Sequence, residues 1–159
     1  MTDLPQLRPG DCLLYKPSGF FGWLIALKTW NRISHVEIYQ GNDKSVASRA
    51  GVGVGMYRTR YAGLARVLRP YREPLNLTAA THFFAQVNGQ KYDWKGILCF
   101  TLAVAQGAKD KMFCSEFATR WYRRAGIPLF GNYDADHIAP AQFLMTDLLQ
   151  EIWRADAGA

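Results

Sequence analysis

The chain has 159 residues, of which 49% are hydrophobic, 14% aromatic and 20% charged, and its formal net charge is +6. This composition excludes an intrinsically disordered chain, and the length predicts a single domain spanning residues 1–159. No apolar run reaches the roughly 20 residues that a membrane-spanning helix needs, so we expect no transmembrane segment. The first residues lack the charged-then-apolar pattern of a signal peptide, which predicts a cytoplasmic protein.

Strand patterns are concentrated in the first half of the sequence. A turn at Pro9-Gly10-Asp11 precedes the first of them, and the Gly-Asn-Asp-Lys turn at 41–44 predicts a hairpin between two others. We expect strands at residues 12–15, 34–40, 45–50 and 64–69, with a bend or short strand at 51–55. Between the first two strands, the apolar spacing of residues 20–30 predicts a buried helix.

Helical patterns dominate the second half. We expect helices at residues 78–88, 93–107, 110–126 and 140–152. Thr78, Asp93 and Asp110 are suitable N-caps for the first three, and Pro140 suits the first position of the last. Early strands followed by late helices predict an α+β fold, in which a small antiparallel sheet packs against helices.

Cys114 is the cysteine with the strongest functional context. A helix capped by Asp110 would have Cys114 in its first turn, where unpaired backbone N–H groups and the helix dipole favour a thiolate and can also receive an oxyanion. The alternative is a small buried apolar side chain. That second interpretation is the one we expect for Cys12, in a strand, and Cys99, in an apolar helix. Three cysteines without paired spacing do not predict a disulfide framework.

His35 is the candidate general base that would serve such a nucleophile. It begins an alternating strand from which its ring can project toward a packed helix, and Glu37 lies two residues further on the same face. A carboxylate beside a histidine can orient the ring and stabilise its cationic form. The alternative is an ordinary strand-end histidine with a solvent-facing glutamate.

Two further groups of residues have simpler explanations. Asp134, Asp136 and His137 form an Asp-x-Asp-His cluster that resembles a loop and helix cap more than a metal site. Five arginines occur between residues 58 and 72, and they form either a solvated face or a patch for an anionic substrate or polymer. No nucleic-acid-binding motif accompanies them, so we expect no specific nucleic-acid partner.

Four short motifs occur in an order that is familiar from one group of enzymes. They are Gly10-Asp11 before a strand, Ser34-His35-Val36-Glu37-Ile38-Tyr39, Tyr92-Asp93, and Phe113-Cys114-Ser115-Glu116 before a helix. The pattern resembles the circularly permuted papain-like cysteine amidases of the NlpC/P60 superfamily, in the YiiX/YaeF-type branch. The histidine strand precedes the cysteine helix there, as it does here.

This resemblance implies that Cys114 is the nucleophile and His35 the base, without any metal or cofactor. It also implies a third polar residue, often on the strand after the histidine strand, but residues 45–50 offer no carboxylate or amide. We therefore assign the third role to Glu37, with Ser48 as the alternative. The expected function is an amidase or peptidase acting on a peptide-like amide, such as a cell-wall peptide. The alternatives are a thioesterase or acyltransferase acting on a lipid, and a catalytically silent viral or phage module.

Overall fold

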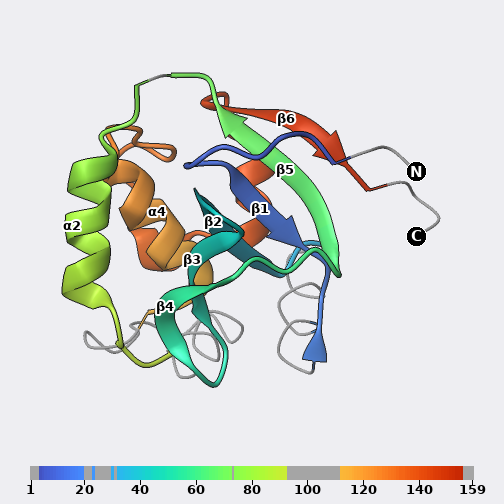
Figure 1. Cartoon of the computed structure of the whole chain (residues 1–159), viewed down its shortest axis with the longest axis horizontal. Helices are drawn as coiled ribbons and strands as arrows, with labels where there is room; N and C mark the ends of the chain where they lie inside the picture. Colours follow the sequence, from blue (N-terminus) through green and yellow to red (C-terminus); the bar gives the residue numbers. More distant parts are fainter. Residues whose placement is uncertain are drawn as a thin grey trace.

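The structure is a computed structural model that describes residues 4–19, 23, 30, 32–72, 74–92 and 112–155. Within these ranges six strands form one antiparallel sheet in the order β4-β3-β2-β1-β5-β6 (Figure 1). The strands are β1 (Cys12–Tyr15), β2 (His35–Gly41), β3 (Lys44–Arg49), β4 (Gly53–Arg58), β5 (Leu64–Pro70) and β6 (Leu149–Arg154). The predicted α+β fold with an antiparallel sheet is confirmed.

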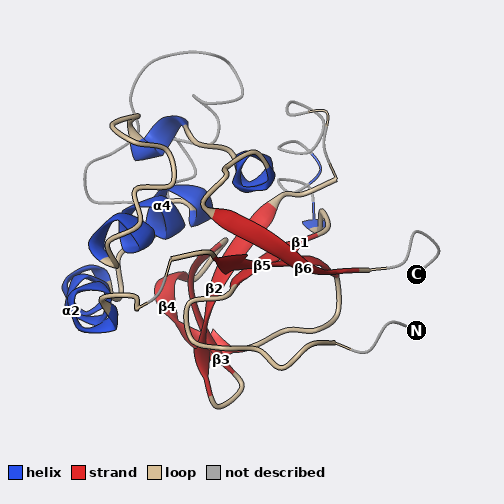
Figure 2. Cartoon of the chain, turned by 90° about the horizontal axis from the view of Figure 1, so that it is seen from above, coloured by secondary structure: helices blue, strands red, loops and turns tan. Residues whose placement is uncertain are grey.

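Two α-helices, α2 (Leu77–Val87) and α4 (Cys114–Arg124), lie on one side of the sheet (Figure 2). Two short 3₁₀ helices follow them, η1 (Ala135–His137) and η2 (Pro140–Leu144). The helix α2 begins one residue earlier than predicted, because Asn76 and not Thr78 is its N-cap. The side chain of Asn76 accepts a hydrogen bond of 3.0 Å from the backbone N–H of Ala79.

The alternation of β1 and β2 divides their side chains between two faces of the sheet. Leu14, Val36 and Ile38 belong to the main hydrophobic core, which they share with α2 and α4. Leu13 and Tyr15 belong to a second, smaller cluster on the opposite face. Because His35 and Glu37 alternate with the core residues Val36 and Ile38, they lie on the face away from the helices.

Aromatic packing fixes α4 against the sheet and against α2. Phe117, Trp121 and Tyr122 are fully buried, and the ring of Phe117 stacks on that of Phe83 at 6.1 Å between centroids. The Tyr122 hydroxyl donates a 2.7 Å hydrogen bond to the carbonyl oxygen of Gly10, next to the start of β1. These contacts determine where the first residue of α4 lies.

The strand β4 is longer than the bend or short strand expected at 51–55. Its backbone is tied to the end of α2, because the Val54 N–H donates to the Gln90 carbonyl at 2.8 Å. Gly53 permits this close approach: its φ is +104°, and a Cβ there would lie 2.2 Å from the Gln90 carbonyl oxygen. The pairing of β4 with β3 adds the outermost strand on this side of the sheet.

The predicted helix at 140–152 is wrong. Pro140 does begin a helical turn, but η2 ends at Leu144, and residues 149–154 form the edge strand β6. This strand pairs with β5 from Leu149 opposite Pro70 to Arg154 opposite Arg66. Pairing with a strand about 80 residues away in sequence therefore overrides the local helical pattern.

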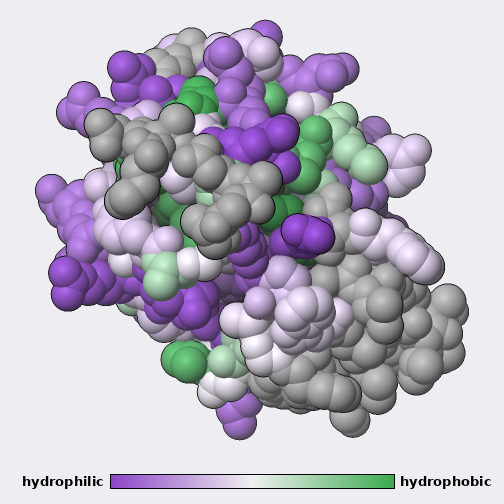
Figure 3. Space-filling view, turned by 90° about the vertical axis from the view of Figure 1, so that its right-hand side faces the viewer, coloured by the Kyte–Doolittle hydropathy of each residue, from purple (hydrophilic) through white to green (hydrophobic). Residues whose placement is uncertain are grey.

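The predicted helix at 93–107 lies outside the described residues, as does nearly all of the one at 20–30. Among the helices that the structure describes, none has both the length and the apolar character needed to cross a membrane. Figure 3 shows one face of the molecule, on which the coloured hydrophobic residues form small separate groups among hydrophilic ones.

Candidate active site

Cys114 is the first residue of α4. Its N-cap is Phe113, an extended residue with φ −93° and ψ 171°, and not Asp110, which lies outside the described residues. The first helical hydrogen bond that the structure gives is from Phe117 N–H to the Phe113 carbonyl, at 3.0 Å. The amides of Cys114 and Ser115 precede this bond and have no carbonyl to reach within the helix. The sulfur therefore lies at the positive end of the helix dipole.

The segment leading into α4 is fixed by β3. The buried Ser48 hydroxyl donates a hydrogen bond to the carbonyl oxygen of Met112, two residues before Cys114. The Met112 N–H donates to the Lys91 carbonyl at 3.2 Å. Ser48, the alternative for the third polar residue, is thus bonded to backbone beside the nucleophile and not to His35.

His35 meets Cys114 at the beginning of β2. The Cys114 thiol donates to the carbonyl oxygen of Ser34 at 4.0 Å, which places the sulfur next to His35, and Cys114 acts electrostatically on the His35 ring. The His35 Nε2 is 3.0 Å from Glu37 Oε1, which leaves Nδ1 as the nitrogen available to the thiol. The structure therefore places Cys114, His35 and Glu37, the three residues singled out in the sequence, in one region: the sulfur lies beside the start of β2, and the His35 ring contacts Glu37.

Glu37 is fully buried and is held by several donors. Arg49 binds it with both ends of its guanidinium, Nε to Oε1 at 2.8 Å and a terminal nitrogen to Oε2 at 2.9 Å. The Ser45 hydroxyl donates to Oε2, and a terminal nitrogen of Arg60 lies 3.4 Å from Oε1. A bidentate arginine combines charge compensation with fixed geometry, so the carboxylate has one position from which to orient His35.

These contacts shift the pKa values of both His35 and Glu37. Burial by itself lowers the pKa of His35, but the charge of Cys114 and its hydrogen bond, together with Glu37, raise it to about 9. Burial by itself raises the pKa of Glu37, but hydrogen bonds from His35 and Arg49 lower it well below its ordinary value. At neutral pH the site therefore contains an ionised carboxylate beside an imidazolium.

The other described cysteine has a different environment. Cys12 is fully buried in β1, and burial raises the pKa of its thiol far above the ordinary value. It is therefore the inert, core-type cysteine that its strand position predicts. Cys99 lies outside the described residues.

Sequence reasoning missed Ser45 and Arg49 as partners of Glu37. Their alternation along β3 places both on one face, but only the register shows that this face is shared with Glu37, since Tyr39 on β2 is opposite Ser45. Knowledge of the strand pairing was the missing signal. Arg60 follows β4 and reaches the same carboxylate from a third segment.

Replacing Arg49 with methionine is expected to lower the free energy of unfolding by about 3 kcal/mol. The substitution leaves the buried Glu37 carboxylate without its main counter-ion, and breaking a buried pair from one side is strongly destabilising. The matched control is Arg58→Met, because Arg58 forms an exposed pair with Asp43 that contributes little to stability. Urea unfolding at pH 7 measures both, and equal losses would show that Arg49 is an ordinary surface arginine.

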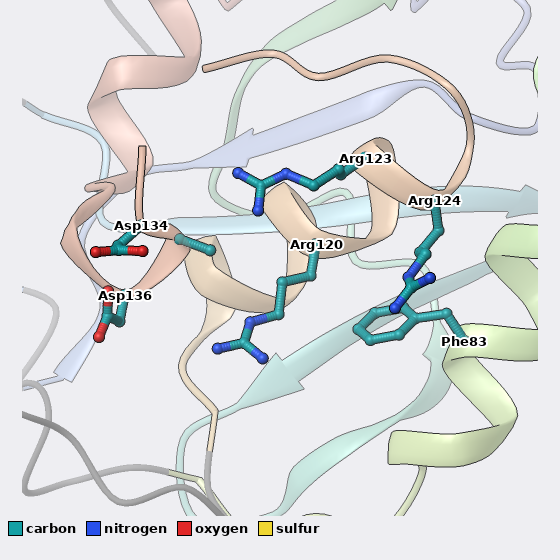
Figure 4. A pocket seen from close by; sticks show the side chains of 7 residues that line it. Phe83, Arg120, Arg123, Arg124, Asp134 and Asp136 are labelled. Atoms are coloured by element: carbon teal, nitrogen blue, oxygen red, sulfur yellow. The ribbon is translucent and has the colours of Figure 1, made fainter. Parts of the chain in front are cut away.

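A hollow of about 390 Å³ lies farther along α4, away from Cys114. Figure 4 shows Arg120, Arg123 and Arg124 extending into it from α4, with Asp134 and Asp136 on its other side. Arg120 forms an ion pair of 2.6 Å with Glu116, the i,i+4 partner expected from the sequence.

The Asp134, Asp136 and His137 cluster borders the same hollow through its two aspartates. Its possible ligand atoms lie within 4.8 Å of one another, and Asp136 pairs with the His137 ring at 2.9 Å. The cluster forms the loop and first turn of η1, as its sequence context predicts.

The comparisons with known proteins give one similar sequence and one similar fold. No family model matches the chain. The probable lipoprotein peptidase YaeF of Escherichia coli K12 is 27% identical over 161 aligned residues, which cover 79% of this chain and 58% of YaeF. The chain thus matches a little over half the length of that relative. The crystal structure of the metalloprotein YiiX (DUF1105) from Escherichia coli O157:H7 has a TM-score of 0.69 at 15% identity, and the match covers 94% of this chain and 98% of YiiX.

The similarity to YaeF extends over most of the chain, and the fold is that of YiiX. In this chain the histidine strand β2 precedes the cysteine helix α4. The similarity to YaeF and the shared fold with YiiX support a place for this chain in a YiiX/YaeF-type family.

Proposed function

We propose that this protein is a cysteine hydrolase that cleaves a peptide-like amide, with Cys114 as nucleophile, His35 as acid and base, and Glu37 as the residue that positions His35. The observation that carries the proposal is the position of the Cys114 thiol, 4.0 Å from the Ser34 carbonyl oxygen and thus next to His35, whose Nε2 is held by Glu37 at 3.0 Å. The peptidase name of YaeF supports the same reaction class.

In the first half of the reaction the Cys114 thiolate attacks the carbonyl carbon, and the electron pair moves to the carbonyl oxygen. The backbone N–H groups at the start of α4 are placed to stabilise this oxyanion. His35 then gives its proton to the leaving nitrogen, the carbon–nitrogen bond breaks, and a thioester to Cys114 remains.

In the second half His35 is neutral and removes a proton from water. The hydroxide attacks the thioester carbonyl, the carbon–sulfur bond breaks, and the carboxylic acid leaves as the thiolate and imidazolium are restored. Glu37 stays ionised throughout and keeps Nδ1 of His35 directed at the sulfur. The cycle uses only side chains, backbone amides and water.

Turnover of a substrate panel tests this proposal. The panel contains muropeptides, N-acyl dipeptides and a palmitoyl thioester, and hydrolysis is followed by mass spectrometry together with the mass added to Cys114. We expect amide cleavage through an acyl-Cys114 adduct, and loss of turnover in Cys114→Ser.

Cys12→Ser is the matched control, because Cys12 is buried in the core and has no part in the reaction. Retained turnover in Cys114→Ser would contradict the mechanism. Turnover confined to the palmitoyl thioester would contradict the amidase assignment and favour an enzyme that acts on acyl lipids.

A further inference from the structure

Arg60 is held in place by the residues on either side of it. The Thr59 N–H donates to the Asp43 carbonyl at 2.9 Å, and the Tyr61 hydroxyl donates to an Asp43 carboxylate oxygen at 2.8 Å. Both neighbours are thus attached to the turn between β2 and β3. The backbone of Arg60 therefore has a fixed position relative to β2, the strand that carries His35.

The Arg60 side chain carries a positive charge that the site leaves largely uncompensated. Its side chain is 46% exposed, and its one hydrogen bond within the described part of the chain is the 3.4 Å contact with Glu37. Arg49 already binds the same carboxylate twice, at 2.8 and 2.9 Å. The Glu37 carboxylate therefore faces two guanidinium groups. Arg60 makes the longer contact, and most of the N–H donors of its guanidinium are not used by Glu37.

Arg60 also lies beside the catalytic histidine. Its guanidinium carbon is 5.4 Å from the centre of the Tyr15 ring, which is 5.8 Å from the His35 ring. Tyr15 is opposite His35 in the pairing of β1 with β2. Among the described residues the buried Tyr15 hydroxyl has no hydrogen-bond partner, and an unpaired buried hydroxyl is a costly and rare feature.

We propose that Arg60 and Tyr15 form a subsite for an anionic group of the substrate, a carboxylate or a phosphate, next to the acyl group that Cys114 attacks. The guanidinium offers charge and two parallel donors, which suit either anion, and the Tyr15 hydroxyl adds a third donor. The subsite rests on the proposed function, since it serves that reaction, and it makes the enzyme selective for acidic substrates.

Alkylation of Cys114 by three matched reagents tests the subsite without a known substrate. The reagents are N-iodoacetylglycine (a carboxylate), N-iodoacetylglycinamide (its neutral analogue) and the N-iodoacetyl derivative of phosphoethanolamine (a phosphate). Second-order rates at pH 7 are measured by peptide mass spectrometry in the full chain. Each anionic rate is divided by the neutral rate, which corrects for any change in the reactivity of the thiol.

Arg60→Gln is expected to lower the anionic-to-neutral ratio about tenfold, the scale of one charge-assisted hydrogen bond. Tyr15→Phe is expected to lower it by about threefold. Arg58→Gln is the matched control. Arg58 is two residues before Arg60, carries the same charge and has a highly exposed side chain, so the anionic-to-neutral ratio in this variant should stay at its wild-type value. A larger Arg60 dependence for the carboxylate reagent would indicate an acidic peptide, and a larger one for the phosphate reagent a phospholipid.

An unchanged ratio in Arg60→Gln, or an equal fall in Arg58→Gln, would overturn the subsite. Failure of the proposed function has a different signature: the neutral reagent would then label Cys114 no faster than Cys12 in the wild-type chain. The two failures are therefore distinguishable in one set of measurements.

Discussion

Replacing His35 with alanine is expected to slow the alkylation of Cys114 by iodoacetamide at pH 7 by about 30-fold or more. The thiolate is the reactive form, and an unassisted thiol with a pKa near 8.5 is only about 3% ionised at pH 7. Removing the imidazolium also takes away the cation beside a sulfur that belongs to a residue only 1% exposed.

The matched control is His82→Ala, because His82 lies on the exposed face of α2. The rate of Cys114 alkylation in His82→Ala should equal the rate in the wild-type chain. The alkylation of Cys12 in the same samples gives an internal reference, since its burial is independent of His35. Equal Cys114 rates in His35→Ala and in the wild type would show that the thiol does not depend on the histidine.

Replacing Glu37 with glutamine is expected to lower the pKa of His35 from about 9 and to reduce turnover about 10- to 100-fold. The carboxylate stabilises the imidazolium, so its removal allows the ring to lose its proton at lower pH. The upper limb of the pH–rate profile, where His35 deprotonates, should therefore move to lower pH. Glutamine retains the size of the side chain and an oxygen that can accept from Arg49.

The pH–rate profile between pH 5 and 10 distinguishes this role from a purely structural one. A variant that only loosens the fold would lose rate at every pH without moving the upper limb. Ser48→Ala is a suitable comparison, because Ser48 bonds the Met112 backbone and does not contact His35. An upper limb at the same pH in Glu37→Gln and the wild type would contradict the positioning role.

Local sequence patterns were sufficient for the elements that carry the site. The alternation of residues 34–40 predicted β2 and placed His35 and Glu37 on one face, and the apolar spacing after Cys114 predicted α4. Local patterns failed where distant pairing decides the structure. Residues 149–154 became a strand because β5 offers a free edge, and no local feature of that segment indicates it.

The same distinction applies to the site. Cys114 and His35 are 79 positions apart, and motif order together with the helix and strand context was enough to propose them as a pair. Arg49 and Arg60 could not be found in this way, because their relation to Glu37 depends on the register of β3 and on the path of the chain after β4. In the sequence, Arg60 was one member of a basic segment and Arg49 was an ordinary strand residue.

The coupling between Cys114 and His35 is tested most directly by NMR titration of the His35 ring in the wild-type chain and in Cys114→Ala. In the wild type we predict a His35 pKa of about 9. We predict a clear fall in Cys114→Ala, because the contributions of the thiol to the raised value are removed. A His35 pKa near 6.5 in the wild type, or the same value in both chains, would contradict the catalytic pair.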